Sequence, residues 1–386
     1  MHETVEDWGA ELLGLHARIA PRFDRAEPRR RARAYVQALL SPVDRKNGWQ
    51  IAERAGETTP DGMQRLLNAA AWDAAAVRDD LRAYVAEHPG DPGGVLILDE
   101  TGFVKKGVES VGVQRQYSGT AGRIESCQIG VFLCYATRRG AAFRDRALYL
   151  PQGWAGDAAR RAAAGVPDEL AFATKPALGR ALLERALDAG VPTAWVTGDS
   201  VYGGDRRRRV WLEGREQPFV LAIRANEPLW QDGPHYVPAA AIAAALPADR
   251  WQRLSAGAGA KGPRRYDWAW RAVWRLQLTA EERAWGHWLL VRRSIADPTE
   301  LAYSIVFAPR VGTTLAALVA VAGTRWQIES GFDAAKGECG LDEYEVRTWD
   351  AWHRHITLAL LAHAFLAVVR AREAKKGMRN PTTCSP

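Results

Sequence analysis

Three short apolar runs, each of strand length, most constrain the fold of this chain. They are Val95–Leu98, Thr193–Thr197 and Pro218–Ile223, and the stretch Lys175–Ala189 ahead of the second run has a helical pattern. Unbroken rather than alternating hydrophobicity is typical of strands that are covered on both faces, as in parallel sheets. Strands interleaved with helices therefore predict an α/β fold.

The segment before these runs is helical in pattern. Leu12, Leu13, Leu15 and Ile19 share one helical face, and we expect residues 1–92 to form an N-terminal helical domain. Two short helices around a glycine within this domain fit a DNA-binding helix-turn-helix. An ordinary αα-corner is the alternative, and the sequence leaves both interpretations open.

The region after the third run is rich in tryptophan. Seven of the sixteen tryptophans lie between residues 227 and 312, and Tyr266–Trp274 alternates with period two, as a strand does. Thr314–Gly340 and Trp349–Arg372 have helical patterns. We therefore expect a first core segment, a β-rich insertion, a second core segment with two long helices, and a disordered tail, over residues 93–226, 227–312, 313–374 and 375–386.

The charge balance favours an anionic partner. The 386 residues include 52 Lys and Arg against 45 Asp and Glu, a formal net charge of +7 with a pI near 9.3. Residues 203–275 carry 13 basic against 7 acidic side chains, whereas residues 1–92 carry 13 against 15. A basic stripe can follow a phosphate backbone. A solvated protein surface is the other interpretation.

Cysteine usage and hydropathy indicate the compartment. Cys127, Cys134, Cys339 and Cys384 have neither C-x-x-C spacing nor a histidine partner at zinc spacing, so we expect free thiols in a reducing cytoplasm. The N-terminal residues lack the apolar segment of a signal peptide. The longest apolar stretch, Thr313–Gly323, is too short to span a bilayer. We expect a cytoplasmic protein that does not enter a membrane.

Three acidic residues stand where a phosphodiester-processing site keeps its metal ligands. Asp99 ends the first apolar run, Asp199 follows the second, and Glu329 lies in the helical pattern after Thr314. Two divalent cations roughly 4 Å apart can activate water and stabilise the leaving oxygen. Mg²⁺ prefers carboxylate oxygens and water as ligands. Each acid alone has an ordinary explanation as a turn former, helix cap or surface residue. Together they predict a Mg²⁺ site in which Mn²⁺ can substitute.

The neighbours of these acids identify a family. Three groups of residues resemble the acidic motifs of insertion-sequence transposases with an Asp-Asp-Glu (DDE) site: Asp99–Gly107 with Gln114–Gly119, Gly198–Gly203, and Arg325–Glu329 followed by Lys336. The resemblance covers roughly residues 30–370. It implies an RNase H-like catalytic core, interrupted by a β-rich insertion before the catalytic glutamate. It also implies that Asp99, Asp199 and Glu329 are the catalytic metal ligands.

The same resemblance implies an activity and partners. Such a protein is a DNA transposase that cleaves and joins element ends in a Mg²⁺-dependent, cut-and-paste reaction. Its partners are double-stranded DNA, at the element ends and at the target, and a second copy in a homodimer. One position departs from the family pattern: the glutamate helix of related transposases carries a tyrosine three residues before the arginine, and Ala322 stands there.

Basic residues near the acids are candidate DNA contacts. Arg325 and Lys336 can share one helix face with Glu329, where Arg325 can clamp a phosphate and Lys336 can bind one as a point charge. A solvated i, i+4 salt bridge is the alternative for this helix. The other candidates are Lys105 and Lys106, which follow Asp99, and Arg207 in the arginine run after Asp199. A purely solvated face is the alternative for them.

The insertion offers an aromatic candidate. Related cut-and-paste enzymes stack a flipped base on an aromatic side chain, and base stacking contributes about 1–3 kcal/mol. Trp268 is our candidate, with Trp270 and Trp274 beside it. A core role for these rings within the insertion is the alternative.

Two other functions stay open from the sequence. The first is a DNA-binding protein derived from a transposase but without catalysis. The second is a metal-dependent hydrolase of small phosphate esters, against which the basic insertion argues.

Overall fold

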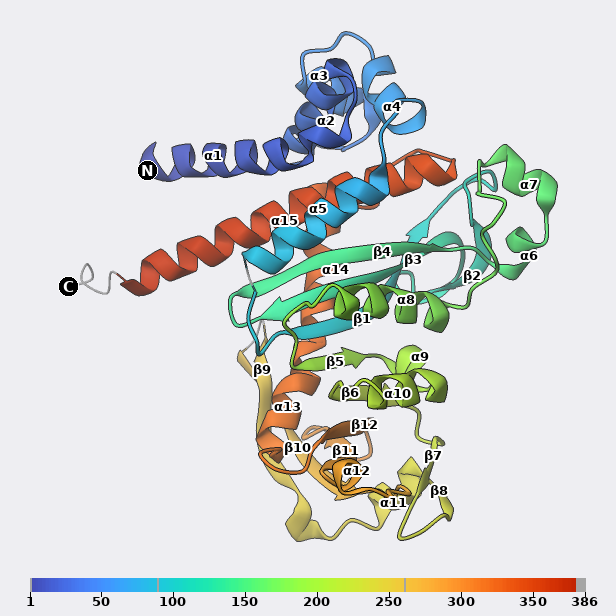
Figure 1. Ribbon diagram of the computed structural model, residues 1–386, viewed down its shortest axis with the longest axis vertical. Helices are drawn as coiled ribbons and strands as arrows, with labels where there is room; N and C mark the ends of the chain where they lie inside the picture. The colour runs from blue at the N-terminus through green and yellow to red at the C-terminus, as the bar shows by residue number, and fades with distance from the viewer. Residues whose placement is uncertain (1, 89, 260–261, 380–386) are drawn as a thin grey trace. The chain divides into compact units, whose positions relative to one another are not determined.

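The chain forms two compact units, each assembled from separate stretches of sequence (Figure 1). The computed structural model describes residues 2–88, 90–259 and 262–379. Unit 1 comprises residues 1–90, 100–174 and 329–386, and unit 2 comprises residues 91–99 and 175–328. The chain passes between the units inside strand β1 (Val95–Val104) and inside helix α14 (Trp326–Cys339). The N-terminal helices share unit 1 with later segments, so they are not a compact unit of their own.

Unit 1 has a long C-terminal helix on which N-terminal helices pack. Its α-helices besides α14 are α1 (His2–Ile19), α2 (Ala26–Leu39), α3 (Gly48–Arg54), α4 (Asp61–Asn68), α5 (Ala74–Glu87), α6 (Gln152–Ala155), α7 (Ala158–Ala163) and α15 (Trp349–Arg379). Helices α2, α4 and α5 contact α15. The hydroxyl of Tyr35 on α2 lies 2.9 Å from Nδ1 of His355 on α15. The expected tail is wrong in its start, because α15 stays helical through Arg379; residues 380–386 lie outside the described residues.

The two helices expected around Gly56 are present as α3 and α4. Asn47 caps α3 by accepting from the backbone N–H groups of Trp49 (3.1 Å) and Gln50 (3.0 Å). Gly56 has a φ of +78°, a conformation that favours glycine, and so permits the turn that follows α3. The pair therefore has the local geometry of a helical corner, which both interpretations of the sequence share.

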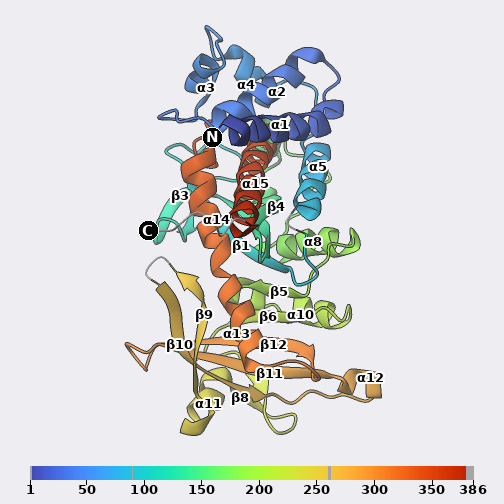
Figure 2. The same cartoon turned by 90° about the vertical axis from the view of Figure 1, so that its left-hand side faces the viewer.

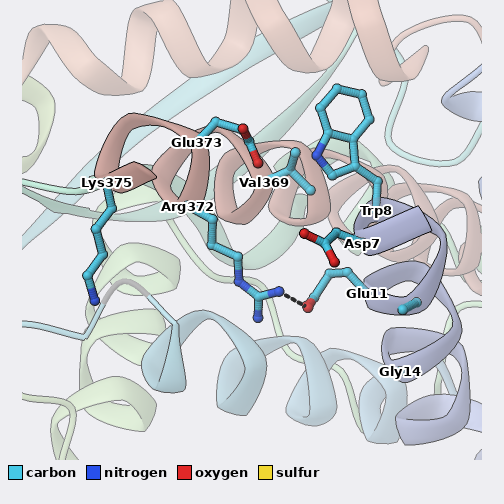
Figure 3. Close-up of a pocket in the computed structure, with 9 residues that line it drawn as sticks. Asp7, Trp8, Glu11, Gly14, Val369, Arg372, Glu373 and Lys375 are labelled. Atoms are coloured by element: carbon cyan, nitrogen blue, oxygen red, sulfur yellow. Dashed lines mark ion pairs between the residues drawn. The ribbon is translucent and has the colours of Figure 1, made fainter. Parts of the chain in front are cut away.

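A hollow of about 510 Å³ lies between α1 and α15 (Figure 3). Figure 3 shows Glu11 of α1 and Arg372 of α15 pointing toward each other, and Oε2 of Glu11 lies 2.5 Å from the Arg372 Nη1. The hydroxyl of Tyr84 also donates to Glu11, at 2.7 Å. The hollow contains none of the candidate site residues, and its charges tie α1 to α5 and α15.

Helix α15 has the length and apolar composition that a membrane-spanning helix would need. Over residues 349–375 it is the one described helix that is long and apolar enough to cross a bilayer. Its most apolar window is 72% buried within the protein, as the core helix of a globular unit would be.

The strands of unit 1 form an antiparallel layer next to the later part of β1. They are β2 (Gln114–Ser118), β3 (Arg123–Thr137) and β4 (Gly140–Tyr149), in the order β2-β3 with β4 on β3. Helices α5 and α15 cover β4. Strand β2 begins at Gln114, directly after a turn in which Val113 N–H bonds to Ser110 O and Gly112 has a φ of +74°.

The core of unit 1 is aromatic. Phe132 on β3, Phe143 on β4 and Phe332 on α14 have ring centroids 4.8–5.5 Å apart. Such edge and tilted contacts add roughly 0.5–1.5 kcal/mol per pair beyond the burial of apolar area. They hold the later part of α14 on the sheet.

Unit 2 is built on one mixed sheet in the order β1-β5-β6-β12-β11-β10-β9. Its further strands are β5 (Trp195–Gly198), β6 (Phe219–Ile223), β9 (Gln252–Gly259), β10 (Gly262–Ala272), β11 (Trp285–Arg293) and β12 (Leu301–Pro309). The pairs β1–β5 and β5–β6 are parallel, and β12 pairs antiparallel with β6. The β-rich segment expected at 227–312 therefore extends the sheet of the first three strands.

Helices lie on both sides of the parallel strands of unit 2 (Figure 2). On one side are α8 (Lys175–Asp188), α9 (Ser200–Gly203) and α10 (Arg206–Glu213), and on the other is α13 (Leu315–Thr324). Smaller elements complete the insertion: β7 (Pro228–Trp230), β8 (Tyr236–Pro238), α11 (Ala239–Ala244) and α12 (Ala280–Arg283). The single helix expected over 314–340 is instead two abutting helices, with Arg325 between α13 and α14 in a helical conformation (φ −52°, ψ −34°).

Candidate active site

The two candidate aspartates lie on neighbouring parallel strands of unit 2. In the β1–β5 pairing, Leu98 is the partner of Gly198, so Asp99 and Asp199 are the next residues on the two strands. Neighbouring strands are about 4.8 Å apart. Asp199 follows the last residue of β5, as the sequence predicted. Asp99 is not at a strand end, because β1 continues to Val104.

The conformation around Asp199 explains its local sequence. Asp199 is the N-cap of α9, and its Oδ1 accepts from the backbone N–H groups of Val201 (2.9 Å) and Tyr202 (3.3 Å). A Cβ on Gly203 would lie 1.8 Å from the carbonyl oxygen of Ala222 on β6, so only glycine permits this approach. The Gly198–Gly203 motif is therefore a tight strand-to-helix turn that fixes the Asp199 carboxylate.

A guanidinium lies beside the other aspartate. Nη1 of Arg325 is 3.6 Å from Oδ2 of Asp99, and the two side chains are 32% and 16% exposed. Both residues belong to unit 2. The Asp99 carboxylate is thus in a cationic environment at the edge of solvent.

A hollow of about 520 Å³ in unit 2 joins several of the candidates. It is lined by Asp199, Arg325, Trp268, Arg292, Tyr303 and Ala322, among others. Arg292 and Tyr303 come from β11 and β12 of the insertion and were not singled out in the sequence. Because the hollow combines a carboxylate, two guanidinium groups and aromatic rings, it suits a phosphate-bearing ligand with planar rings.

The three candidate tryptophans of the insertion differ in their surroundings. Trp268 lines the hollow but is only 4% exposed, and its buried Nε1 has no hydrogen-bond partner among the described residues. Trp270 stacks on Trp288 at 5.5 Å and 24°, and Trp274 packs against Trp230 at 5.2 Å. Trp270 and Trp274 therefore serve packing within the insertion, and base stacking by Trp268 stays a prediction.

Helix α14, which carries the third acid, begins in the sequence of unit 2 and continues in that of unit 1. Glu329 is in the first turn of α14, four residues after Arg325, and is assigned to unit 1. Lys336 is farther along α14, where its Nζ donates to Oγ1 of Thr101 at 2.8 Å and of Thr120 at 3.2 Å. Among the described residues, no group of three or more His, Cys, Asp or Glu is arranged to hold a metal ion. Convergence of the three acids on a cation therefore stays a prediction.

The remaining basic candidates divide into inward and outward side chains. Lys105 turns inward: its Nζ donates to Tyr344 O at 3.0 Å and lies 3.5 Å from the centre of the Tyr344 ring. Burial lowers the pKa of Lys105 to about 8, while Asp342 and Glu345 oppose the shift. Lys106 is exposed. These positions favour Lys106 over Lys105 as a contact for DNA.

The arginine run of α10 divides in the same way. Arg208 is fully buried and donates to Tyr202 O at 2.6 Å and Pro176 O at 2.5 Å. Arg209 is buried and pairs with Glu227 at 2.7 Å. Arg206 and Arg207 are exposed. The candidate Arg207 is thus on the outer face of α10.

Comparison with known proteins gives three matches. A family model described as DDE superfamily endonuclease matches residues 18–276. The chain is 28% identical over 190 residues to a protein named probable transposase for insertion sequence element IS701 from Microchaete diplosiphon. The aligned region covers 48% of this chain and 47% of that protein. A solved structure of piggyBac transposase, in a synaptic complex with hairpin DNA, aligns with a TM-score of 0.50 and 10% identity over 92% of this chain and 68% of that one.

These matches differ in what they support. The family match includes Asp99 and Asp199 but ends before Arg325 and Glu329. The chain matches about half the length of the IS701 protein. The structural likeness, at 10% identity, concerns the fold alone.

Proposed function

This chain belongs to the DDE superfamily endonucleases, and on that premise we propose that it is a DNA transposase. Its proposed reaction is Mg²⁺-dependent cleavage and strand transfer at insertion-sequence ends, of the cut-and-paste type. The observation that carries the proposal is the β1–β5 register, which brings Asp99 and Asp199 onto adjacent parallel strands. Carboxylates in this arrangement suit an RNase H-like catalytic core.

The donor set suits a hard divalent cation. Asp99 and Asp199 offer carboxylate oxygens, and a carboxylate has enough lone pairs to accept N–H groups at Asp199 and still bind a cation. Glu329 would complete the set from α14. When bound, Mg²⁺ would supply an activated water and stabilise the leaving oxygen of a phosphodiester.

The basic residues have separate roles in this proposal. Arg325 is within ion-pair distance of Asp99 and lines the same hollow as Asp199, so it can bind a DNA phosphate next to the reacting groups. Lys336 binds a second phosphate from α14. Lys106 and Arg207, both exposed, extend the contact along the DNA backbone. The partners are element-end and target DNA, bound by two copies of the chain.

The compartment follows from the thiols. Cys134 and Cys339 are buried free thiols, as in a protein of a reducing compartment, and Cys127 is buried too. We therefore place the transposase in the cytoplasm, where it reaches chromosomal DNA.

A cleavage assay tests the proposal. A duplex carrying the terminal repeats that flank the gene is incubated with the protein and Mg²⁺, or Mn²⁺, and cleavage is followed on a denaturing gel. Asp99→Asn and Asp199→Asn should each cut at least about 100-fold more slowly, because each removes a carboxylate that would hold the cation. Asp249→Asn, an exposed acid of unit 2, is the matched control and should cut normally.

Each other outcome points to a different function. Tight, salt-sensitive binding of the duplex without cleavage in either metal would favour a transposase-derived DNA-binding protein. Cleavage of a small phosphodiester but not of duplex DNA would favour a hydrolase. Equal cleavage by the wild type and both Asn variants would remove the two aspartates from the mechanism.

A further inference from the structure

Three segments of unit 1 meet at the ammonium group of Lys336. Nζ donates to Oγ1 of Thr101 (2.8 Å), on the later part of β1, and to Oγ1 of Thr120 (3.2 Å), in the turn between β2 and β3. The two hydroxyl oxygens are 3.2 Å apart, and Oγ1 of Thr120 lies 3.4 Å from Gly102 O. The hydroxyls and the ammonium thus form one connected hydrogen-bond network.

The turn that carries Thr120 is held close to β1. A Cβ on Gly102 would lie 2.4 Å from Oγ and 3.2 Å from Cβ of Ser118, so a larger residue at 102 would displace the Ser118 side chain at the end of β2. Oγ of Ser118 also accepts from the N–H of Ala121 at 3.3 Å, and Gly122 closes the turn with a φ of +65°. The turn thus lies close to β1 where Gly102 faces Ser118, and this approach brings the Thr120 hydroxyl to the Lys336 ammonium.

The network fixes a side chain that is otherwise flexible. A lysine ammonium sits at the end of a four-carbon stem with large rotamer entropy. Two hydroxyl acceptors restrict this freedom, and because they are neutral they leave the positive charge available to an anion. Burial lowers the pKa of Lys336, and Asp342 and Asp333 oppose that shift. Fixing the ammonium before it meets a ligand reduces the entropy lost on binding.

We propose that Thr101 and Thr120 are positioning residues that hold the Lys336 ammonium at the place where it binds a DNA phosphate. The β2–β3 turn is then a support for a DNA contact made from α14. The inference rests on the proposed function, because it takes Lys336 to be a phosphate contact. It adds two residues, from two other segments, that neither the acidic motifs nor the basic candidates included.

The test compares DNA affinity across a small set of full-length variants. Affinity for the element-end duplex is measured by fluorescence anisotropy between 50 and 200 mM salt. Lys336→Gln should weaken binding and lower the slope of log affinity against log salt by about 1, since one phosphate contact is lost. Thr120→Val keeps the side-chain shape and removes the hydroxyl, and should weaken binding about 2- to 10-fold. Thr120→Ser should restore the wild-type affinity.

Two further variants distinguish positioning of Lys336 by Thr120 from a nonspecific effect of substitution on DNA binding. Thr120→Val combined with Lys336→Gln should bind no more weakly than Lys336→Gln alone, because residues that act through one another are not additive. Thr299→Val, at an exposed threonine of unit 2, is the matched control and should bind as the wild type does. Thr120 is itself exposed, so its variants should fold; thermal melting checks this. Thr101 is 5% exposed, and its Ser and Val variants are compared in the same way.

The outcomes distinguish this inference from the proposed function. Wild-type affinity in the Val variants, together with weak binding by Lys336→Gln, would overturn the positioning role and leave the transposase proposal intact. Wild-type affinity in Lys336→Gln would overturn the inference, because Lys336 would then not be a phosphate contact. Loss of cleavage in Asp199→Asn would still support the transposase proposal in that case. Weak binding by Thr120→Ser equal to that of Thr120→Val would also count against it, because the hydroxyl would then not be the acting group.

Discussion

Arg325 holds the first candidate aspartate of this chain: its Nη1 lies 3.6 Å from Oδ2 of Asp99. The arginine is at the junction of α13 and α14, and the aspartate is inside β1. A positive group therefore already stands beside a carboxylate to which we assign a cation. Arg325 and a divalent cation would compete for the same oxygens, or the guanidinium would move to a phosphate when the cation binds.

The first prediction concerns this competition. In Arg325→Gln, the Mg²⁺ concentration for half-maximal cleavage should fall, because Asp99 is freed from its guanidinium. The pair is partly exposed and worth roughly 0.2–1 kcal/mol, so the decrease should be about 1.5- to 5-fold. DNA affinity should fall at the same time. Arg325→Lys keeps the charge and is the control. An unchanged Mg²⁺ requirement in Arg325→Gln would show that the ion pair does not compete.

The second prediction separates the two roles of Asp199. The residue caps α9, and N-cap loss costs about 0.5–2 kcal/mol, so Asp199→Ala should lower the free energy of unfolding by about that amount. Asp199→Asn keeps a side-chain oxygen for the cap and should be nearly as stable as the wild type. Both variants should lose cleavage. Denaturant unfolding gives the stabilities, and a stable but inactive Asn variant would separate the cap from catalysis.

The third prediction contrasts two neighbours in α10. Arg207→Ala should weaken DNA binding without changing stability, because the side chain is exposed. Arg208→Ala should lower the free energy of unfolding by at least about 2 kcal/mol, because it leaves the buried Tyr202 carbonyl and the partly buried Pro176 carbonyl without their donor. Thermal melting and DNA titration of both variants check this. Loss of affinity without loss of stability in Arg208→Ala would reverse the assignment.

The apolar runs predicted the three parallel strands of unit 2, but the register in which these strands pair could not be predicted from them. Val95–Leu98 and Thr193–Thr197 are recognisable as buried strands because of their unbroken hydrophobicity. The pairing of Leu98 with Gly198 depends on how α8 and the intervening chain fold back, which no local pattern encodes. Adjacency of Asp99 and Asp199 therefore came from the resemblance to a family and from the structure.

The directions of the Lys105 and Lys336 side chains also could not be predicted from the sequence. Both are lysines near acidic motifs, and both were natural candidates for DNA. Lys105 donates to Tyr344, which is 239 residues away, and Lys336 donates to Thr101, which is 235 residues away. The direction of a lysine side chain is set by such distant partners. Tyr303 and Arg292 were missed for the same reason, since strands β11 and β12 bring them to the hollow only in the folded sheet.

Three histidines on α15, of which His355 and His363 are buried and His353 is half-buried, lead to a prediction about stability in acid. Burial lowers the pKa of His353 and His355 to about 3 and that of His363 to about 4, from an ordinary value of 6.5. In His355, Nε2 donates to Gly340 O (3.1 Å) and Nδ1 accepts from the Tyr35 hydroxyl (2.9 Å), which suits the neutral ring. His363 is 5% exposed, and its Nδ1 has no hydrogen-bond partner among the described residues.

These shifts fix the sign of the pH dependence. Below pH 6.5 the unfolded chain binds protons at these rings, and the folded chain does not until about pH 3–4. The free energy of unfolding should therefore fall as the pH falls from 6.5 toward 4, by up to about 1.4 kcal/mol per pH unit for each histidine. His363→Leu should reduce this slope by about one histidine's share and leave stability at pH 7 little changed. His355→Leu should reduce the slope equally but lower stability at pH 7, because Tyr35 and Gly340 lose their partner. Urea unfolding at pH 7.0, 5.5 and 4.5 measures both effects, and equal slopes in the wild type and His363→Leu would contradict the assignment of His363 as a neutral core residue.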